Sequence, residues 1–395
     1  EAVWAVAGAL ALVAARLLPW QDALRAVGKG ADVYLFLAGM MLLSELARRE
    51  GLFDFLAARA VRHARGSPVR LFALVYAIGI GVTVFMSNDA TAVVLTPAVC
   101  AAARKAGARP LPYLLACAFI ANAASFVLPV SNPANLVIFG AHMPPLATWL
   151  AQFALASLGS IAMTYAVLRW RLGDALAGRI AHAIEQPVLS PSGRRAGWGL
   201  AGVASVLVAA SAAGLPLGLA TLAASAVVAA ITVSGKREPP WPLLKGISWS
   251  VLALVAGLFV LVEGLARTGL ATLASDALRE ASAAAPGRAA WGAGALVAVL
   301  CNAVNNLPAG LMAGSVMAGA DAGALMRGAV AIGIDLGPNL SVTGSLATLL
   351  WLVAIRREGE NVTGWQFLRV GALAMPLALV AALGGLQLQH LLSFP

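Results

Sequence analysis

Charged residues are scarce in this sequence of 395 residues, because Asp, Glu, Lys and Arg make up only 11% of it while 61% is hydrophobic. A soluble domain of this length needs charge on its surface, so the composition excludes a soluble fold. A lipid bilayer removes that need, since it is itself an apolar solvent. The length and the mean hydropathy of +0.86 fit roughly ten membrane-crossing segments of about 20 residues each.

Cysteine and histidine are also few, with three and four copies. The Cys residues show no CxxC or Cys–His spacing and the His residues form no cluster, so we expect no disulfide framework, no zinc site and no cofactor. The sequence holds no HExxH motif and no recognisable nucleophile–base pair, which argues against a membrane enzyme. The residues concerned are Cys100, Cys117, Cys301, His63, His142, His182 and His390.

The net charge of +10 comes from Lys and Arg in short connections between apolar runs. This placement is typical of cytoplasmic loops and does not indicate nucleic-acid binding. The loop 141–147, predicted on the opposite side, has no Lys, Arg, Asp or Glu. The loop 267–289 fits less well, because it would place Arg267, Arg279 and Arg288 outside. The basic connections are 48–70, 104–109, 169–195, 236–245 and 356–357.

Two pairs of apolar runs are too short and too closely joined for two spans each. Residues 70–103 are interrupted by Ser-Asn-Asp at 87–89, and residues 290–320 by Asn-Asn-Leu-Pro at 305–308. Both stretches are predicted to be re-entrant hairpins with tips near the middle of the bilayer. The stretches 111–140 and 328–355 contain Pro, Gly and polar residues, and are predicted to be broken transmembrane helices.

The chain also repeats itself. Residues 37–52 and 255–270 share seven of sixteen identities at an offset of 218, and this offset also places Asn88 on Asn306. An odd number of predicted crossings separates the copies, so the repeats are inverted. Inverted repeats with broken helices are a known design for alternating access.

The predicted fold is therefore an all-α polytopic membrane protein with inverted structural repeats, each holding a re-entrant hairpin and a broken transmembrane helix. The first repeat is predicted at 1–168, a cytoplasmic linker at 169–197 and the second repeat at 198–395. The apolar run 198–214 has no partner in the first half, so we expect one further helix before Glu1.

Four polar motifs lie inside the apolar stretches, two at the hairpin tips and two at the helix breaks. Pro and Gly free backbone groups there, which must line a cavity or bond to side chains. Asn, Ser and Thr offer donors and acceptors without charge and suit a small, neutral, hydroxyl-rich solute. The simpler alternative is that the Asn residues only join helices. The candidate substrate-binding residues are Asn88, Thr91, Asn132, Asn135, Asn305, Asn306, Asn339, Ser341, Thr343 and Ser345.

Carboxylates inside the membrane are costly and usually functional, and two are predicted here, Asp89 and Asp335. They are candidates for proton coupling, with Asn122 as a polar partner because it pairs with Asp335 at an offset of 213. The alternative is a structural carboxylate held by hairpin N–H groups. Glu45 and Glu263 lie near helix ends beside Arg49 and Arg267, where interfacial ion pairs are as plausible as a transport role.

The motifs FMSNDATAVVLTP (85–97), AFIANAASFVLPVSNPANL (118–136), NNLPAGLMAG (305–314) and IDLGPNLSVTGSLATLLWLVAIRREG (334–359) resemble the signatures of the ArsB family of arsenite/antimonite permeases. The resemblance covers nearly the whole chain. It implies export of arsenite or antimonite across the bacterial inner membrane by proton antiport, in a fold with two hairpins and two unwound helices. It also implies a possible cytoplasmic ATPase partner, called ArsA. The chain departs from the family at Asn122, where relatives have an acid, so proton coupling here would rest on Asp89 or Asp335.

The physical chemistry of the motifs agrees with that substrate. Arsenous acid is an uncharged trihydroxide near neutral pH, whereas a dicarboxylate needs cations, and the four motifs contain no Lys or Arg. Proton exchange for a neutral solute moves net charge, so the membrane potential contributes about 2.3 kcal/mol per charge per 100 mV. The alternative is a sodium-coupled carboxylate carrier or a sodium/proton antiporter of the same ion transporter superfamily.

Overall fold

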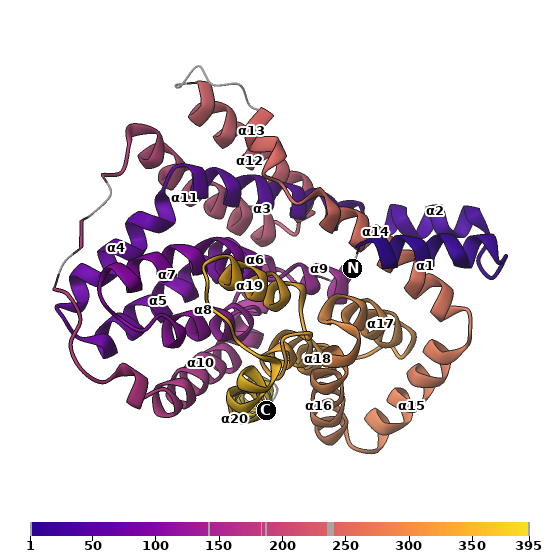
Figure 1. The fold of residues 1–395 in the computed structure, drawn as a ribbon. Coiled ribbons are helices and arrows are strands. Elements are labelled where there is room, and N and C mark those ends of the chain that lie inside the picture. The colour runs from indigo at the N-terminus through magenta and orange to yellow at the C-terminus, as the bar shows by residue number, and fades with distance from the viewer. Residues whose placement is uncertain (1, 141–142, 183, 186–187, 235–240, 394–395) are drawn as a thin grey trace.

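The computed structural model describes residues 2–140, 143–182, 184–185, 188–234 and 241–393. Within these ranges the chain forms helices, turns and loops, and no strand (Figure 1). Seven helices are long and apolar enough to cross a membrane, and a bent helix pair raises the number to eight. The chain is therefore an all-helical polytopic membrane protein. The seven helices are α5 (Pro68–Phe85), α10 (Leu146–Arg171), α11 (Pro191–Ala212), α12 (Leu217–Ser234), α14 (Trp249–Ala266), α16 (Pro286–Val304) and α20 (Gly364–Ser393).

The remaining apolar runs are divided into shorter helices, which is why fewer long helices form than the ten spans predicted. The bent pair is α2 (Trp20–Lys29) and α3 (Ala31–Arg49), which meet at Gly30 with a bend of 49°. The other helices are α1 (Ala2–Ala14), α4 (Leu52–Ala64), α6 (Asn88–Ala90), α7 (Thr96–Lys105), α8 (Leu111–Ala123), α9 (Pro133–Phe139), α13 (Trp241–Lys245), α15 (Leu270–Ala284), α17 (Asn306–Gly319), α18 (Ala324–Leu336) and α19 (Leu346–Arg357). Short η-helices cover Thr91–Leu95 (η1), Pro129–Ser131 (η2), Asp174–Leu176 (η4) and Gly337–Asn339 (η5).

Two helix pairs pack closely through glycine. α3 packs along α12, and α14 packs along α1. A Cβ on Gly39 would lie 2.7 Å from the backbone nitrogen of Leu222 in α12, and a Cβ on Gly257 would lie 2.8 Å from the carbonyl carbon of Ala5 in α1. Small residues allow helices to approach in this way in membranes. The two glycines are the pair that the sequence repeat places at an offset of 218.

The helices α5, α8, α10, α16, α18 and α20 form a bundle in which α10 packs along α20, α16 along α18 and α5 along α8 (Figure 1). Buried indoles brace the broken helices: Trp149 Nε1 donates to the Phe126 carbonyl at 3.0 Å, and Trp351 Nε1 donates to the Leu114 carbonyl at 3.0 Å. Buried Trp side chains need such partners. The bundle thereby fixes the non-helical segments at the helix breaks.

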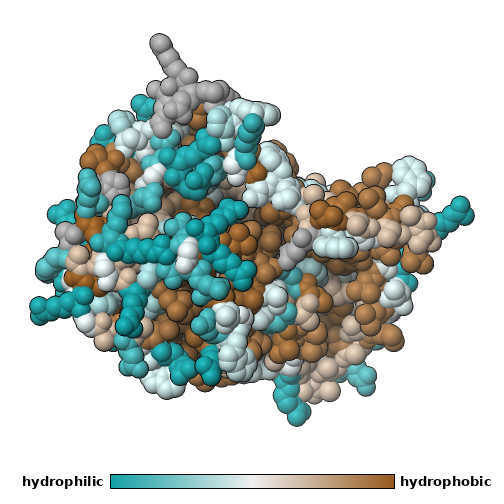
Figure 2. Space-filling model, in the orientation of Figure 1, coloured by the Kyte–Doolittle hydropathy of each residue, from teal (hydrophilic) through white to brown (hydrophobic). Residues whose placement is uncertain are grey.

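The surface divides by polarity. Figure 2 shows hydrophobic side chains over the part of the molecule that holds α1, α14 and α15, and hydrophilic side chains gathered on the opposite part of the same view. Large apolar residues such as Trp4, Leu265 and Leu273 are exposed there. An apolar surface of this kind fits lipid as its solvent.

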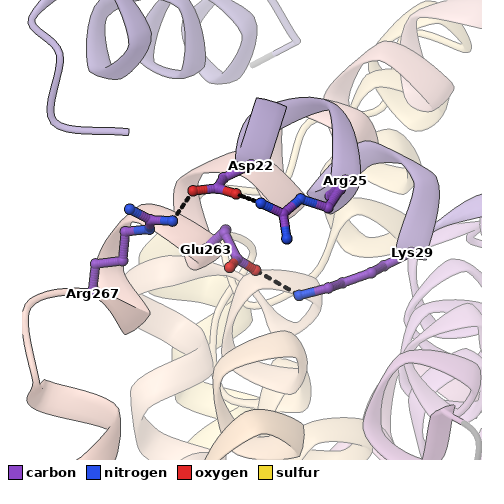
Figure 3. Close-up of polar contacts among 5 residues, drawn as sticks. All are labelled: Asp22, Arg25, Lys29, Glu263 and Arg267. Atoms are coloured by element: carbon purple, nitrogen blue, oxygen red, sulfur yellow. Dashed lines mark hydrogen bonds and ion pairs between the residues drawn. The ribbon is translucent and has the colours of Figure 1, made fainter. Parts of the chain in front are cut away.

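Charged residues near helix ends join the short helices α2 and α13 to the long ones. Lys29 donates to Glu263 at 2.7 Å, and Asp22 pairs with both Arg25 and Arg267 (Figure 3). Glu263 therefore forms an ion pair, but with Lys29 and not with Arg267, because α2 lies against α14 and supplies Lys29 to Glu263 and Asp22 to Arg267.

The equivalent acid, Glu45, pairs as predicted. It accepts from Arg49 at 2.8 Å and also from Arg48 at 2.7 Å. Arg49 in turn donates to the Pro242 carbonyl of α13 at 2.6 Å. Glu263 thus joins α14 to α2 directly, whereas Glu45 holds Arg49, which joins α3 to α13.

Helices cover both ends of the predicted linker 169–197. α10 continues to Arg171, where Arg169 and Arg171 favour the C-terminal end of a helix. α11 begins at Pro191, with the Ser190 side chain accepting from the Gly193 N–H at 2.9 Å. Among the predicted loop residues, Ala141, His142, Lys236 and Arg237 lie outside the described residues, as does Glu1.

Candidate functional site

The first hairpin reverses at Met86 and Ser87. Ser87 is extended and begins α6, with its side chain accepting from the Ala90 N–H at 3.2 Å. Asn88 is buried and its side chain accepts from the Asp89 N–H at 2.9 Å. Asp89 is partly exposed, and no hydrogen bond of its carboxylate is found among the described residues. The tip therefore places the Asn88 amide next to the Asp89 carboxylate, and no hydrogen bond to a described residue holds that carboxylate in place.

A π-helical turn follows this tip. It spans Thr91–Leu95 and precedes Pro97, which lacks the N–H that a regular α-helix would use. The Thr96 hydroxyl donates to the Thr91 carbonyl at 2.9 Å, and the Thr91 hydroxyl bonds to Thr83 of α5 at 2.8 Å. Such turns are frequent at functional sites. Thr91 is fully buried, so it holds the hairpin closed.

The second hairpin reverses at a single residue, Asn305. Its φ of 75° is unusual for a residue other than Gly, although Asn tolerates positive φ better than most. The Asn305 side chain accepts from the Leu307 N–H at 3.4 Å, which caps α17. The Asn306 N–H donates to the Gly344 carbonyl at 2.8 Å. The second tip is thereby joined to the second helix break.

Each of the stretches 111–140 and 328–355 is interrupted and forms two main helices. In the first, α8 ends at Ala123 and α9 restarts after Asn132, whose side chain accepts from the Ala134 N–H at 3.0 Å. In the second, α18 ends at Leu336 and α19 restarts after Ser345, whose side chain accepts from the Thr348 N–H at 3.1 Å. Each restart is therefore an N-cap that satisfies a freed backbone donor.

The two breaks contact each other through one acidic pair. Asn132 Nδ2 donates to Asp335 Oδ1 at 2.7 Å, and both side chains are buried. We call this contact the acidic crossing, because it joins the first broken helix to the second.

A second contact joins the same helices without charge. Asn122 Nδ2 donates to Asn339 Oδ1 at 3.0 Å and to Thr348 Oγ1 at 3.3 Å. Asn339 Nδ2 donates to the Phe119 carbonyl at 3.0 Å, and Thr348 bonds to Ser345 at 2.8 Å. We call this contact the neutral crossing, since every member is an amide or a hydroxyl.

Three buried oxygen atoms near the crossings lack a hydrogen-bond partner among the described residues. They are Asp335 Oδ2, Asn122 Oδ1 and Asn135 Oδ1. Asn135 is held by its other end, because its Nδ2 donates to the Ser125 carbonyl at 2.9 Å. Unpaired buried acceptors are costly and often mark a functional site. They could accept a proton donor or coordinate a cation.

The polar group beside the second hairpin tip is more open. Asn302 of α16 accepts from the Ser341 hydroxyl at 2.7 Å through its side chain and from the Thr343 hydroxyl at 2.9 Å through its carbonyl. Asn302 Nδ2 donates to the Gly337 carbonyl at 3.0 Å. Thr343 is exposed and Ser341 partly exposed. We call these three residues the open cluster.

The predicted residues thus fall into separate groups. The structure brings Asn122, Asn132, Asp335, Asn339 and Ser345 together at the crossings, and Ser341 and Thr343 at the open cluster. Asn88, Asp89 and Thr91 lie at the first tip, with Asn305 and Asn306 at the second, and Asn135 donates to the Ser125 carbonyl and interacts with Asp335.

Two residues of these groups, Thr348 and Asn302, were not predicted, although the sequence contained a signal for Thr348. Thr348 lies 213 residues after Asn135, the same offset that relates Asn122 to Asp335. Asn302 lies on α16 before the reversal at Asn305, so helical spacing does not relate it to Asn305 or Asn306. Comparing residues at the offset of 213, and allowing Thr to stand in for Asn, would have identified Thr348.

Metal or thiol chemistry has little support in the described part of the chain. No group of three His, Cys, Asp or Glu residues able to hold a metal ion is found there. Cys100, Cys117 and Cys301 are free and buried, each on a different helix. Cys301 Sγ bonds to the Ala298 carbonyl of its own helix at 3.3 Å.

A membrane-embedded bundle whose broken helices cross at a buried polar centre defines a secondary transporter. The chain matches the citrate transporter family (CitMHS) over residues 1–337, and it belongs to that family.

The chain is also similar to curated and solved transporters. An arsenical pump membrane protein of Escherichia coli is 26% identical over 362 residues, which cover 89% of this chain and 84% of that protein. An uncharacterized transporter of Mycobacterium tuberculosis is 26% identical over 402 residues, covering 96% and 91%. The YdaH transporter of Alcanivorax borkumensis shares the fold, with a TM-score of 0.59, 17% identity and coverage of 95% and 89%.

Proposed function

We propose that this transporter exports arsenite or antimonite from the cytoplasm in exchange for protons. The observation that supports this most strongly is the chemistry of the crossings and the open cluster, which consist of amides and hydroxyls with one carboxylate. Trivalent arsenic and antimony are uncharged hydroxides near neutral pH, so a site of this kind can donate to and accept from each hydroxyl group.

The open cluster is the proposed entry to the substrate site. Ser341 and Thr343 are within reach of a solute because they are partly or fully exposed, and Asn302 holds both of them in place. Asn305 and Asn306 lie beside them through the bond to Gly344. The remaining proposed substrate residues, Asn88, Thr91, Asn132, Asn135, Asn339 and Ser345, would face the solute in other states of the transport cycle.

Proton coupling is assigned to the two intramembrane acids. Asp335 is fully buried, accepts one bond from Asn132 and has one oxygen without a partner. A proton on that oxygen would neutralise the acidic crossing, because a buried carboxylate is stable only when it is paired or neutral. Asp89 at the first tip is the more accessible acid. Asn122, which cannot ionise, is the polar partner of these two acids.

The proposed architecture is two inverted repeats, 1–168 and 198–395, with a cytoplasmic linker at 169–197. Contacts between the two repeats support it. α3 of the first repeat packs on α12 of the second, and α14 of the second repeat packs in the corresponding way on α1 of the first. The second half of each broken helix also contacts the hairpin of the other repeat, α9 with α17 and α19 with α6 and η1. On this proposal, α5 with α6–α7 and α16 with α17 are re-entrant hairpins in the bacterial inner membrane.

The alternative is a sodium-coupled carboxylate carrier or a sodium/proton antiporter. The name of the family, citrate transporter, favours it. The absence of Lys and Arg from residues 81–96, 119–139, 298–312 and 332–348 opposes it, because a multivalent anion needs positive charge in a site of low dielectric. An ATPase of the ArsA type is a further proposed partner on the basic cytoplasmic loops.

The deciding experiment is arsenite uptake into inverted membrane vesicles. We expect uptake that ignores sodium and stops when a protonophore is added. Strict sodium dependence, or citrate uptake without arsenite uptake, would reject the proposal in favour of the alternative. Asp89→Asn, Asp335→Asn and the double variant test the coupling residues: an unchanged pH dependence in all three would reject their role.

A further inference from the structure

A cavity lies away from the crossings, at the end of the first hairpin where α5 begins. It has a volume of about 340 Å³ and lies among the start of α5, the loop between α7 and α8, and the segment after η4. This volume is within the range of small-molecule sites. Its wall includes Pro68 and Tyr113, and the Tyr113 hydroxyl donates to the Pro68 carbonyl at 3.3 Å. The cavity therefore touches the base of the hairpin directly.

Two arginines from different segments line this cavity. Arg109 belongs to the α7–α8 loop and Arg179 to the segment after η4. Both are exposed, and neither has a hydrogen bond or ion pair with another described residue. Guanidinium groups bind phosphate and carboxylate through paired N–H donors. Two unpaired guanidiniums around one polar cavity indicate an anionic ligand.

The third charged residue of the cavity limits what that ligand can be. Asp174 also lines the wall and is exposed. A carboxylate repels an anion, but it accepts hydrogen bonds from hydroxyl groups. The lining thus suits a compact oxyanion that has hydroxyl groups at its other end. Gly107 and Gly178 leave room for such a ligand, since both have positive φ and no side chain.

The backbone beside the cavity connects the two ends of the hairpin region. The Ile180 N–H donates to the Gly66 carbonyl at 3.1 Å, and the Ala181 N–H donates to the Ala106 carbonyl at 2.8 Å. Gly66 precedes α5 and Ala106 follows α7, so this segment spans both ends of the first hairpin. A ligand between Arg109 and Arg179 would strengthen that connection.

We propose that the cavity between Arg109 and Arg179 binds a small hydroxylated oxyanion from the cytoplasm, a phosphate monoester or a hydroxycarboxylate, and that the bound ligand restrains the first hairpin. The site is separate from the transport path, because none of the crossing or open-cluster residues lines it. Its ligand regulates transport and is not carried.

The test uses the purified full-length protein in detergent, with inorganic phosphate, glycerol phosphate and citrate as probes. We expect saturable binding by calorimetry that chloride at equal ionic strength does not reproduce. Arg109→Gln or Arg179→Gln should weaken binding about tenfold each, because each removes a charge-assisted contact. Asp174→Asn should tighten inorganic phosphate several-fold and reduce the preference for glycerol phosphate.

The matched control is Arg59→Gln, which removes an exposed arginine on α4 outside the cavity. It should bind all probes as the wild type does. If Arg59→Gln and Arg109→Gln lost the same amount of binding affinity, the net charge of the protein would explain the effect, and the proposal would be overturned. The absence of saturable binding by every probe would also overturn it.

Two further measurements separate the possible sources of the anion and its effect. In nanodiscs, glycerol phosphate should bind equally well with phosphatidylcholine and with phosphatidylglycerol. Loss of binding only with phosphatidylglycerol would assign the arginines to a lipid headgroup and overturn a soluble ligand. Hydrogen exchange of residues 177–181 should slow when ligand is present, in the wild type and in Asp335→Asn alike. This readout does not depend on arsenite transport, so it holds or fails separately from the proposed function.

Discussion

The acidic and the neutral crossing occupy corresponding places in the sequence but differ in charge. Asp335 bonds to Asn132, the N-cap of α9, whereas Asn122 bonds to Thr348 in the first turn of α19. Asp335 lies 213 residues after Asn122, and Thr348 lies 213 residues after Asn135. One crossing can therefore change its charge by binding a proton, and the other cannot.

This difference shows how two related contacts can serve different purposes: one stabilises the fold, and the other responds to pH. The neutral crossing has four side chains linked by three direct hydrogen bonds, so it holds the broken helices together at any pH. The acidic crossing has one short bond and one unpaired oxygen. We expect the conformational change to occur at the acidic crossing, with the neutral crossing as the fixed point.

The largest expected effect comes from removing the ionisable group while keeping its shape. Asp335→Asn retains an acceptor for Asn132, so the fold should persist with little change in the thermal unfolding midpoint. Arsenite uptake driven by a pH gradient should fall to the level of vesicles without the protein. The control is Asp54→Asn, an exposed carboxylate on α4, which should transport normally. If Asp335→Asn kept its arsenite uptake with an unchanged pH profile, the acidic crossing would have no role in proton coupling that the neutral crossing lacks.

Breaking the neutral crossing should reduce stability more than any change at the surface. Asn122→Leu removes two hydrogen bonds and leaves the buried Asn339 Oδ1 without its donor, which should cost about 2–4 kcal/mol of the free energy of unfolding. Thermal unfolding in detergent measures it. Asn302→Ala is the comparison, since water can replace an amide at the open cluster. If both variants lose the same stability, the neutral crossing is no special fixed point.

The N-cap at the start of α19 should have a smaller effect. Ser345→Ala removes the acceptor of the Thr348 N–H and should cost about 1 kcal/mol. Asn132→Ala should cost more, because it removes an N-cap and the partner of Asp335 together. Ser205→Ala, at an exposed serine of α11, serves as the control for loss of a hydroxyl. Equal costs for Ser345→Ala and Asn132→Ala would show that the acidic crossing adds nothing.

The smallest expected effect lies far from both crossings, at the pair shown in Figure 3. Lys29→Gln removes one exposed ion pair with Glu263 and should cost about 0.2–1 kcal/mol, less at high salt. Unfolding at two salt concentrations measures it. A cost as large as that of Asn122→Leu would mean that α2 and α14 stabilise the fold as much as the crossings do.

The sequence predicted the helix breaks because Pro, Gly and Asn interrupt apolar runs in a recognisable way. Each of the breaks at Ser87, Asn132, Asn305 and Ser345 is found in the structure as the start of a new helix. Their local cause is N-capping, which depends only on neighbouring residues.

Contacts between distant segments were less predictable. Asp22 and Lys29 replaced the expected Glu263–Arg267 pair, because no local pattern shows that α2 lies against α14. The partners of Asp335 and Asn122 also come from the other half of the chain. The offset of 213 pointed to their correspondence, but only the packing of the broken helices showed which residues each of them bonds.

The most direct measurement is the simultaneous recording of arsenite and proton movement in proteoliposomes. We predict that the wild-type protein moves protons against arsenite in a fixed ratio, and that Asp335→Asn loses proton movement although arsenite still binds. Proton movement that persists at the same ratio in Asp335→Asn, or arsenite movement without any proton movement in the wild type, would contradict the account.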